Sequence, residues 1–292
     1  MEPTALERYT AAASRSSRVV ITQYSTSFSL ACRMLDRATR LHISNIYALV
    51  RLADEVVDGV ASEAGLGPAA VAEALQRLEE ETEAALRTGY STNLIVHAFA
   101  CTARSQGIGT TLTRPFFASM RSDLSVDTHD AATLEDYIYG SAEVVGLMCL
   151  EVFRKMPHAP SGHDCDLDSA ARHLGAAFQK VNFLRDLAED TSELGRSYFP
   201  GLDPKAFSDK HKDQLVTEIR ADLEMAAIGI RHLAPRAAHA VGTAHGLFEA
   251  LVDELDSTPA SELLRRRISV PNRRKALIAL RSSWGYRRKA AA

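Results

Sequence analysis

The sequence has few of the residues that build disulfide frameworks and metal centres. Its 292 residues include four cysteines, at positions 32, 101, 149 and 165. No two of them have the C-x-x-C spacing, so neither a zinc site nor a disulfide framework is indicated, and we expect reduced, packed thiols. No histidine follows a glutamate by three positions, which argues against the Glu-x-x-His ligands of a di-iron carboxylate bundle.

Long hydrophobic runs are also missing. No uninterrupted apolar stretch approaches the roughly 20 residues needed to span a bilayer, and no secretory signal opens the chain. We therefore expect a cytoplasmic protein. The formal net charge of −3 argues against a general nucleic-acid binder. Basic residues nevertheless concentrate between positions 265 and 289, where they would lie on a solvated terminal helix, contact diphosphate or approach an anionic membrane surface.

Proline is sparse, with ten residues in the chain. Long segments instead carry apolar residues at a period of 3.6 without strand-like alternation, which predicts an all-α protein. No polar linker divides the chain and no repeat of 20 to 50 residues occurs, so we predict one domain over residues 1–292, a helical bundle around a central cavity. The predicted helices include residues 16–33, 40–58, 133–155 and 166–193.

The most informative pattern is a pair of polar stripes on otherwise apolar helices. Each stripe contains two aspartates four residues apart, and like charges at this spacing oppose helix formation by roughly 0.2–0.5 kcal/mol. Steps of three and four residues keep each stripe on one helix face. The first stripe contains Tyr47, Arg51, Asp54 and Asp58, and the second contains Gln179, Asn182, Asp186 and Asp190.

A bound cation would reverse this charge repulsion. Carboxylate and amide oxygens suit Mg²⁺, which usually takes one or two carboxylates together with phosphate oxygens and water. A single acidic pair would mean little, because several are expected by chance among 37 acidic residues. Two pairs on helices apolar enough to be substantially buried favour a site for Mg²⁺ and a phosphate-bearing substrate.

Five segments, in order, resemble the phytoene and squalene synthases, the head-to-head trans-prenyltransferases. The resemblance covers nearly all of the chain, and the fourth segment is the most specific. The segments are YSTSFSLA (24–31), NIYALVRLADEVVDG (45–59), DLSVDTHDAATLEDYIYGSAEVVGLM (123–148), FQKVNFLRDLAEDTSELGRSYFP (178–200) and RRRISVPNRRKAL (265–277).

The resemblance implies the isoprenoid synthase fold, with both aspartate motifs on the upper rim of the cavity. Mg²⁺, with Mn²⁺ as an alternative ion, would be held between these motifs and the diphosphates of two prenyl substrates. Tyr47 and Arg51 would act with the aspartates on the diphosphate and the reacting carbons. The implied metal ligands are Asp54, Asp58, Asn182, Asp186 and Asp190.

Further residues are implied to contact substrate. Helix phase also places Met148 on one face with Tyr137 and Ser141, although ordinary core packing explains Met148 and Phe28 at least as well. The chain departs from the family pattern at Thr26, where many relatives carry lysine, and at Glu143, where a small residue is common. The implied substrate contacts are Ser25, Ser27, Phe28, Tyr137, Ser141, Gly146, Gln179, Arg185, Arg196, Tyr198 and Arg267.

The implied reaction joins two molecules of geranylgeranyl diphosphate through a cyclopropyl diphosphate to phytoene, without NADPH. Such an enzyme would have downstream carotenoid enzymes as partners and a peripheral membrane contact for product release. A squalene or dehydrosqualene synthase using farnesyl diphosphate is the alternative, because the sequence does not show which residues close the cavity. An alternative from another class is a non-catalytic interaction protein of the same fold.

Overall fold

The structure is a computed structural model that describes residues 2–126, 129–157, 159, 166–189 and 206–278. It confirms the all-α prediction, since these residues form helices and contain no strand. The helices are α1 (Ala5–Tyr24), α2 (Thr26–Cys32), α3 (Arg37–Val57), α4 (Val60–Glu63), α5 (Pro68–Thr88), α6 (Leu94–Gln106), α7 (Thr110–Ser122), α8 (Ala131–Ile138), η1 (Tyr139–Glu143), α9 (Val144–Arg154), α10 (Leu167–Glu189), α11 (Asp209–Ile230), α12 (Pro235–Ser257) and α13 (Ala260–Leu263).

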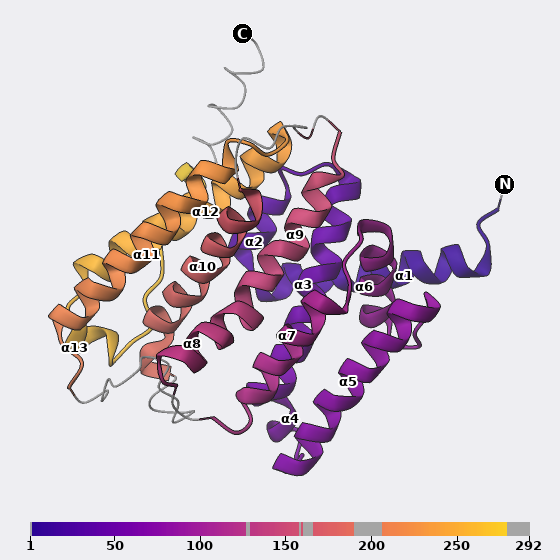
Figure 1. The fold of residues 1–292 in the computed structure, drawn as a ribbon, viewed down its shortest axis with the longest axis horizontal. Helices are drawn as coiled ribbons and strands as arrows, with labels where there is room; N and C mark the ends of the chain where they lie inside the picture. Colours follow the sequence, from indigo (N-terminus) through magenta and orange to yellow (C-terminus); the bar gives the residue numbers. More distant parts are fainter. Residues whose placement is uncertain (1, 127–128, 158, 160–165, 190–205, 279–292) are drawn as a thin grey trace, which may run out of the picture.

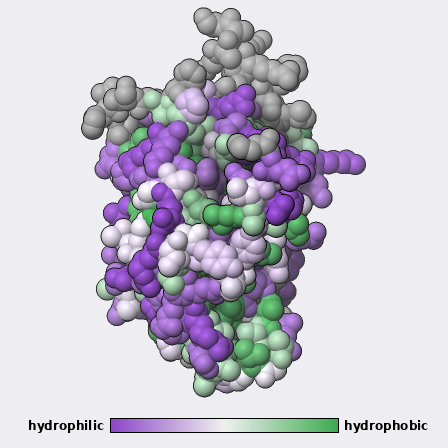
Figure 2. Space-filling view, turned by 90° about the vertical axis from the view of Figure 1, so that its right-hand side faces the viewer, coloured by the Kyte–Doolittle hydropathy of each residue, from purple (hydrophilic) through white to green (hydrophobic). Residues whose placement is uncertain are grey.

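The long helices form a bundle in which α10 packs against α9, α11 and α12 (Figure 1). On the other side of α9, helix α3 packs against α5, α6 and α7. The first turn of α1 projects from the bundle, while the rest of the helix packs against α6 and α3. No helix among the described residues combines the length and hydropathy required to cross a membrane. The face seen in Figure 2 is mostly hydrophilic, with small hydrophobic areas between.

Local signals explain where several helices begin and end. A capping box at the start of α1 pairs Thr4 with Glu7, so two otherwise unpaired N–H groups are satisfied. Asp36 caps α3 by accepting hydrogen bonds from the N–H groups of Ala38 and Thr39. Helix α5 ends at Gly89, whose φ of 81° is readily adopted by glycine.

The predicted helix 16–33 is two helices, and the break falls at Ser25. The backbone there is extended, with φ −143° and ψ 110°, and the Ser25 Oγ accepts a hydrogen bond of 3.1 Å from the N–H of Phe28. Ser25 is therefore the N-cap of α2. The chain turns at this point, and α2 packs against α12 as well as α1.

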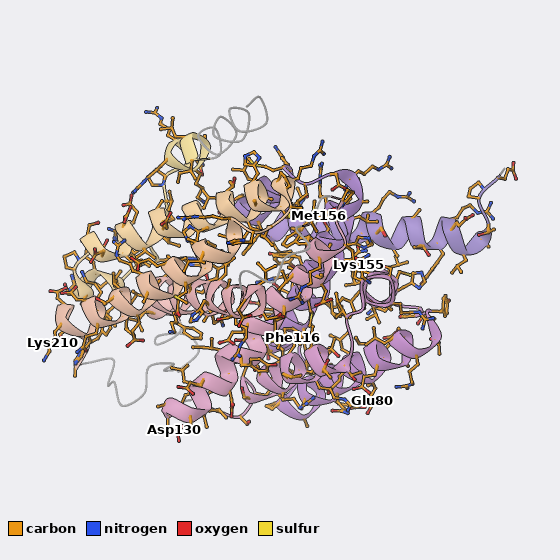
Figure 3. All side chains as sticks on the ribbon, turned by 45° about the horizontal axis from the view of Figure 1, so that its top comes forward. Glu80, Phe116, Asp130, Lys155, Met156 and Lys210 are labelled. Atoms are coloured by element: carbon orange, nitrogen blue, oxygen red, sulfur yellow. The ribbon has the colours of Figure 1, made fainter. Side chains whose placement is uncertain are left out.

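The predicted helix 133–155 is continuous in space but contains the π-helix η1 between α8 and α9. Figure 3 shows Asp130 and Met156 at the two ends of this segment. Within η1, a Cβ added at Gly140 would lie 2.3 Å from the carbonyl oxygen of Pro115 and 2.1 Å from the Oγ of Ser119. Glycine thus lets η1 approach the backbone of α7 closely.

The π-turn changes which residues of α9 face inward. Met148, placed with Tyr137 and Ser141 by ideal helix phase, is 1% exposed and packs in the cluster that includes Phe116 and Leu49. Cys149 faces the cavity instead. A π-turn contains more residues than an α-turn, so it rotates every following side chain relative to the residues before it. The core-packing interpretation of Met148 is the one that the structure supports.

Candidate active site

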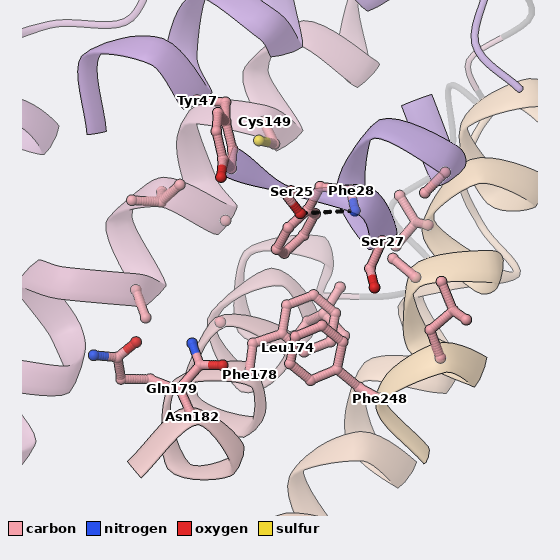
Figure 4. A pocket seen from close by; sticks show the side chains of 18 of the residues that line it. Ser25, Ser27, Phe28, Tyr47, Cys149, Leu174, Phe178, Gln179, Asn182 and Phe248 are labelled. Atoms are coloured by element: carbon pink, nitrogen blue, oxygen red, sulfur yellow. Dashed lines mark hydrogen bonds between the residues drawn. The ribbon is translucent and has the colours of Figure 1, made fainter. Parts of the chain in front are cut away.

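One cavity of about 670 Å³ lies between α2, α3, α10, α12 and the α8–η1–α9 segment (Figure 4). Its lining changes from polar to apolar along the helices. On α3 the lining runs from Ile43 to Asp54, which are eleven residues, or about 16 Å, apart. On α10 it runs from Leu167 to Arg185. We call the end near Asp54 and Arg185 the polar end, and the opposite end the far end.

The structure brings most of the predicted site residues together around this cavity. Asp58 follows α3 as its C-cap residue and is exposed, and Asp186 lies beside the lining residue Arg185 without itself lining the cavity. Asp190, Arg196 and Tyr198 lie outside the described residues. The predicted residues that line the cavity are Ser25, Ser27, Phe28, Tyr47, Arg51, Asp54, Tyr137, Ser141, Gly146, Gln179, Asn182, Arg185 and Arg267.

Arg51 organises the first stripe at the polar end. Its Nη1 lies 3.1 Å from the Oδ2 of Asp54, and its other terminal nitrogen pairs with Glu55. The guanidinium carbon lies 4.5 Å from the ring centroid of Tyr24, within the range of a cation–π contact. Glu55 therefore neutralises Arg51 although it is not part of the predicted stripe.

Two guanidinium groups meet one carboxylate in the second stripe. Arg185 Nε lies 2.8 Å from Asp186 Oδ1, and Arg267 Nε lies 2.9 Å from the same oxygen. The amide groups of Gln179 and Asn182 lie on the same helix and face the cavity (Figure 4). The polar end thus presents carboxylate and amide oxygens together with guanidinium groups, a set suited to both a divalent cation and an anionic substrate.

Lys275 also lines the cavity, eight residues after Arg267. Its side chain forms no ion pair with another described residue. In the sequence, Lys275 belongs to the C-terminal basic run, for which a solvated helix, a diphosphate contact and an anionic membrane surface were the alternatives. Other basic residues of that run form surface pairs, as Arg266 does with Glu262 and Arg274 with Asp253.

Aromatic rings line the middle of the cavity. The ring of Phe28 lies 6.1 Å from Tyr47, 5.8 Å from Phe178 and 6.0 Å from Phe248, and the last two rings stack at 3.7 Å. Burial raises the pKa of the Tyr47 phenol, while Arg51 lowers it and Asp54 raises it. Tyr47 therefore stays protonated and neutral. Phe28 both packs in this aromatic group and contributes to the cavity wall.

The thiols of Cys32 and Cys149 lie towards the far end. They pack in the hydrophobic cluster that also contains Leu35, Phe153 and Ala240. Burial raises the pKa of Cys32 to about 12, and burial together with the neighbouring Cys32 raises the pKa of Cys149 to about 12. Both therefore remain neutral, small, apolar groups. The sequence indicated packed thiols but not that these two line the cavity; Cys32 lies four residues after Phe28 on α2, a spacing that could have indicated it.

Gly146 lines the cavity but also allows two helices to touch. A Cβ at this position would lie 2.6 Å from the carbonyl oxygen of Ala171 on α10. A Cβ at Gly175 on α10 would meet the carbonyl oxygen of Ala142 at the same distance. The two glycines therefore bring the cavity walls formed by η1–α9 and α10 together. Glu143, the other departure noted in this segment, pairs with Arg172 rather than lining the cavity.

Comparison with known proteins gives consistent relatives. A phytoene synthase of Pseudescherichia vulneris is 28% identical over 264 residues, which cover 83% of this chain and 82% of that protein. A phytoene synthase of Mycobacterium tuberculosis is 26% identical over 274 residues, 87% of this chain and 84% of that protein.

Solved structures show the same fold. A dehydrosqualene synthase crystallised with a ligand superposes with a TM-score of 0.77 at 19% identity, covering 96% of this chain and 98% of that one. The squalene synthase HpnC from Alicyclobacillus acidocaldarius superposes with a TM-score of 0.71 at 20% identity, covering 84% and 93%. These likenesses confirm the predicted isoprenoid synthase fold. Residues 21–274 match the sequence model of squalene/phytoene synthases, so this chain belongs to that family of prenyltransferases.

Proposed function

We propose that this protein is a phytoene synthase, which condenses two molecules of geranylgeranyl diphosphate head to head through a cyclopropyl (prephytoene) diphosphate. The observation that carries the proposal is a cavity with diphosphate- and metal-binding groups at one end and a long apolar wall beyond them. Such a cavity matches a substrate with a charged head and a hydrocarbon tail. Curated relatives named phytoene synthase support the same reaction.

The donor set at the polar end fits Mg²⁺. Asp54 and Asn182 line the cavity from two different helices, and Asp186 lies one turn after Asn182 on α10. No group of three or more His, Cys, Asp and Glu side chains converges among the described residues. A divalent ion with few protein ligands, completed by diphosphate oxygens and water, suits this arrangement. When bound, the ion would stabilise the charge on departing diphosphate; we assign Asp58 and Asp190 to it from the resemblance.

The cationic side chains would bind the two diphosphates. Arg51, Arg185 and Arg267 line the polar end and are now paired with carboxylates, so each can exchange a carboxylate for a diphosphate oxygen. Lys275 supplies an ammonium group to the wall of the same cavity.

The apolar wall would protect the reaction from water. Ionisation of an allylic diphosphate leaves a carbocation, which water would capture in an open site. The rings of Phe28, Tyr47 and Phe178 lie between the polar end and the far end, where their faces can stabilise positive charge. Once the cyclopropyl diphosphate has formed, a second ionisation would release the remaining diphosphate and rearrange the ring, and loss of a proton would then produce the central double bond of phytoene, without a reductant.

The small side chains towards the far end favour the twenty-carbon substrate. Cys32, Cys149 and Ala240 line the cavity there beside the larger Leu35 and Phe153, and none of these three small side chains is large enough to close it. The lined part of α10 runs from Leu167 to Arg185, which are eighteen positions, or about 27 Å, apart. Farnesyl diphosphate would leave part of this length unfilled. The structures similar to this chain include a dehydrosqualene synthase and a squalene synthase, which support the alternative of squalene or dehydrosqualene formation.

The product would leave an apolar cavity for an apolar destination. We therefore propose that the enzyme is cytoplasmic and contacts a membrane surface peripherally during product release. The next carotenoid enzymes would take up phytoene there. Sedimentation of the protein with anionic and neutral vesicles, with and without accumulated product, tests this part.

The direct test incubates the purified protein with geranylgeranyl or farnesyl diphosphate and Mg²⁺, with and without NADPH, and identifies the hydrocarbon by mass spectrometry. We expect phytoene from the twenty-carbon substrate, in equal amounts with and without NADPH. A thirty-carbon hydrocarbon as the main product would favour the squalene or dehydrosqualene alternative. No hydrocarbon under any combination would favour the non-catalytic interaction protein.

A further inference from the structure

The side chain of Tyr137 is held on several sides where α8 meets the cavity. Its ring centroid lies 6.0 Å from that of Phe183 on α10 and 5.0 Å from that of His129. Its hydroxyl donates a hydrogen bond of 3.1 Å to the Oδ2 of Asp123. Tyr137 is 6% exposed and lines the cavity, so its phenol has little freedom to reorient.

Asp123 is well placed to hold this phenol. It is the C-cap residue of α7, directly after the last helical residue. One turn earlier in the same helix, the Oγ of Ser119 donates a hydrogen bond of 3.1 Å to the backbone carbonyl of Tyr137. The end of α7 therefore contacts both the backbone and the hydroxyl of Tyr137. The close approach of Gly140 to Pro115 fixes the same two elements against each other.

We propose that Asp123 is a positioning residue that acts through Tyr137 on the reaction in the cavity. The carboxylate accepts the phenol hydrogen bond, which fixes the ring orientation and directs the hydroxyl dipole away from the hydrocarbon. A charge-assisted hydrogen bond also increases the electron density on the phenol oxygen. Both effects stabilise a carbocation that forms beside the ring. This inference rests on the proposed prenyltransferase function of the cavity.

The negative charge of Asp123 distinguishes this role from a purely structural one. A neutral acceptor in place of the carboxylate would still hold the ring, because an amide oxygen also accepts a hydrogen bond. It would not polarise the phenol to the same degree. Asp123→Asn therefore removes the polarisation of the Tyr137 phenol, and Asp123→Ala also removes the hydrogen bond that holds the ring.

The first experiment compares the kinetics of Asp123→Asn, Asp123→Ala, Tyr137→Phe and the double variant Asp123→Asn/Tyr137→Phe with those of the unmodified chain. We expect kcat to fall about tenfold for Asp123→Asn and about a hundredfold for Asp123→Ala, with KM within about twofold. The double variant should be no slower than Tyr137→Phe alone, because the carboxylate acts through the hydroxyl. Asp136→Asn, an exposed carboxylate on the same helix as Tyr137, is the matched control and should leave kcat unchanged.

Additive losses in the double variant, or unchanged kcat in Asp123→Asn, would overturn the proposal. So would a rise in KM with kcat retained. Circular dichroism and thermal unfolding of every variant identify a loss that comes from misfolding, and the Asn variant keeps the acceptor if the Ala variant does not fold.

The second experiment needs no activity. In protein labelled with ¹³C at the tyrosine Cζ, the resonance of Tyr137, assigned by its absence in Tyr137→Phe, should shift in Asp123→Asn and stay in place in Asp136→Asn. An unmoved resonance in Asp123→Asn would contradict the contact itself. If the unmodified chain forms no hydrocarbon but the Tyr137 resonance still shifts in Asp123→Asn, the proposed function is overturned while the contact stands.

Discussion

Arg267 lies 2.9 Å from Asp186, measured from Nε to Oδ1, and so connects the segment after α13 to the end of α10. The same carboxylate also pairs with Arg185. A guanidinium thus occupies the position next to an oxygen that we assign to Mg²⁺. Binding of the ion and the substrate would require the aspartate to turn to the cation and the arginines to turn to the diphosphates.

The first prediction concerns the two metal-binding helices. Asp54→Asn and Asp186→Asn each keep the shape of the side chain but remove its charge, so we expect turnover to be abolished while the helical content stays unchanged. Hydrocarbon formation and far-ultraviolet circular dichroism measure the two quantities. Asp213→Asn on α11, a surface carboxylate outside the cavity, is the control. Retained activity in either cavity variant would defeat the metal assignment.

The second prediction separates the ion pair of Arg267 from its substrate contact. Arg267→Gln should raise KM for the prenyl diphosphate about tenfold, because one charge-assisted contact to diphosphate is lost. The free energy of unfolding should change by less than about 1 kcal/mol, since the Arg267 side chain is 50% exposed and such pairs contribute little.

The neighbouring Arg266 provides a matched control for this experiment. It pairs with Glu262 at 2.8 Å on the surface and does not line the cavity. Arg266→Gln should leave both KM and the unfolding free energy unchanged. Equal effects of the two substitutions on KM would show that Arg267 acts only through the general charge of the segment.

The third prediction concerns chain length. Cys32→Phe introduces a ring towards the far end of the cavity, where Cys32 lines the wall at 7% exposure. We expect the ratio of kcat/KM for the twenty-carbon to the fifteen-carbon substrate to fall at least about tenfold. Cys32→Ala leaves the space open and should not change the ratio. An unchanged ratio in the Phe variant would mean that the prenyl tail does not reach Cys32.

The fourth prediction concerns the contact between η1 and α7. Gly140→Ala places a Cβ 2.3 Å from the carbonyl oxygen of Pro115, which is backbone and cannot move aside easily, so the variant should lose about 1–3 kcal/mol of stability. Gly242→Ala on α12 is the control, because its Cβ would meet Ile230 at 3.8 Å, an ordinary contact. That control should be neutral or stabilised by up to about 1 kcal/mol. Chemical denaturation of both variants measures the difference, and equal stabilities would disprove the close approach.

The sequence alone determined the helical class and the stripes that carry the site. Helix faces depend on local spacing, so the spacing of Tyr47, Arg51 and Asp54 on one helix, and of Gln179 and Asn182 on another, is enough to place each set on a common face. The tertiary structure places both faces on one cavity. The metal ligation assigned to these residues stays a prediction.

Tertiary packing decided the rest, because it depends on residues far apart in the chain. The break at Ser25 and the π-turn at Tyr139–Glu143 follow from how α2 and η1 pack on other helices, and the π-turn places Cys149 rather than Met148 in the cavity. The hydrogen bond from Tyr137 to Asp123 and the pairing of Arg267 with Asp186 bridge 14 and 81 positions. No helical periodicity predicts such contacts, since they exist only once the helices are assembled.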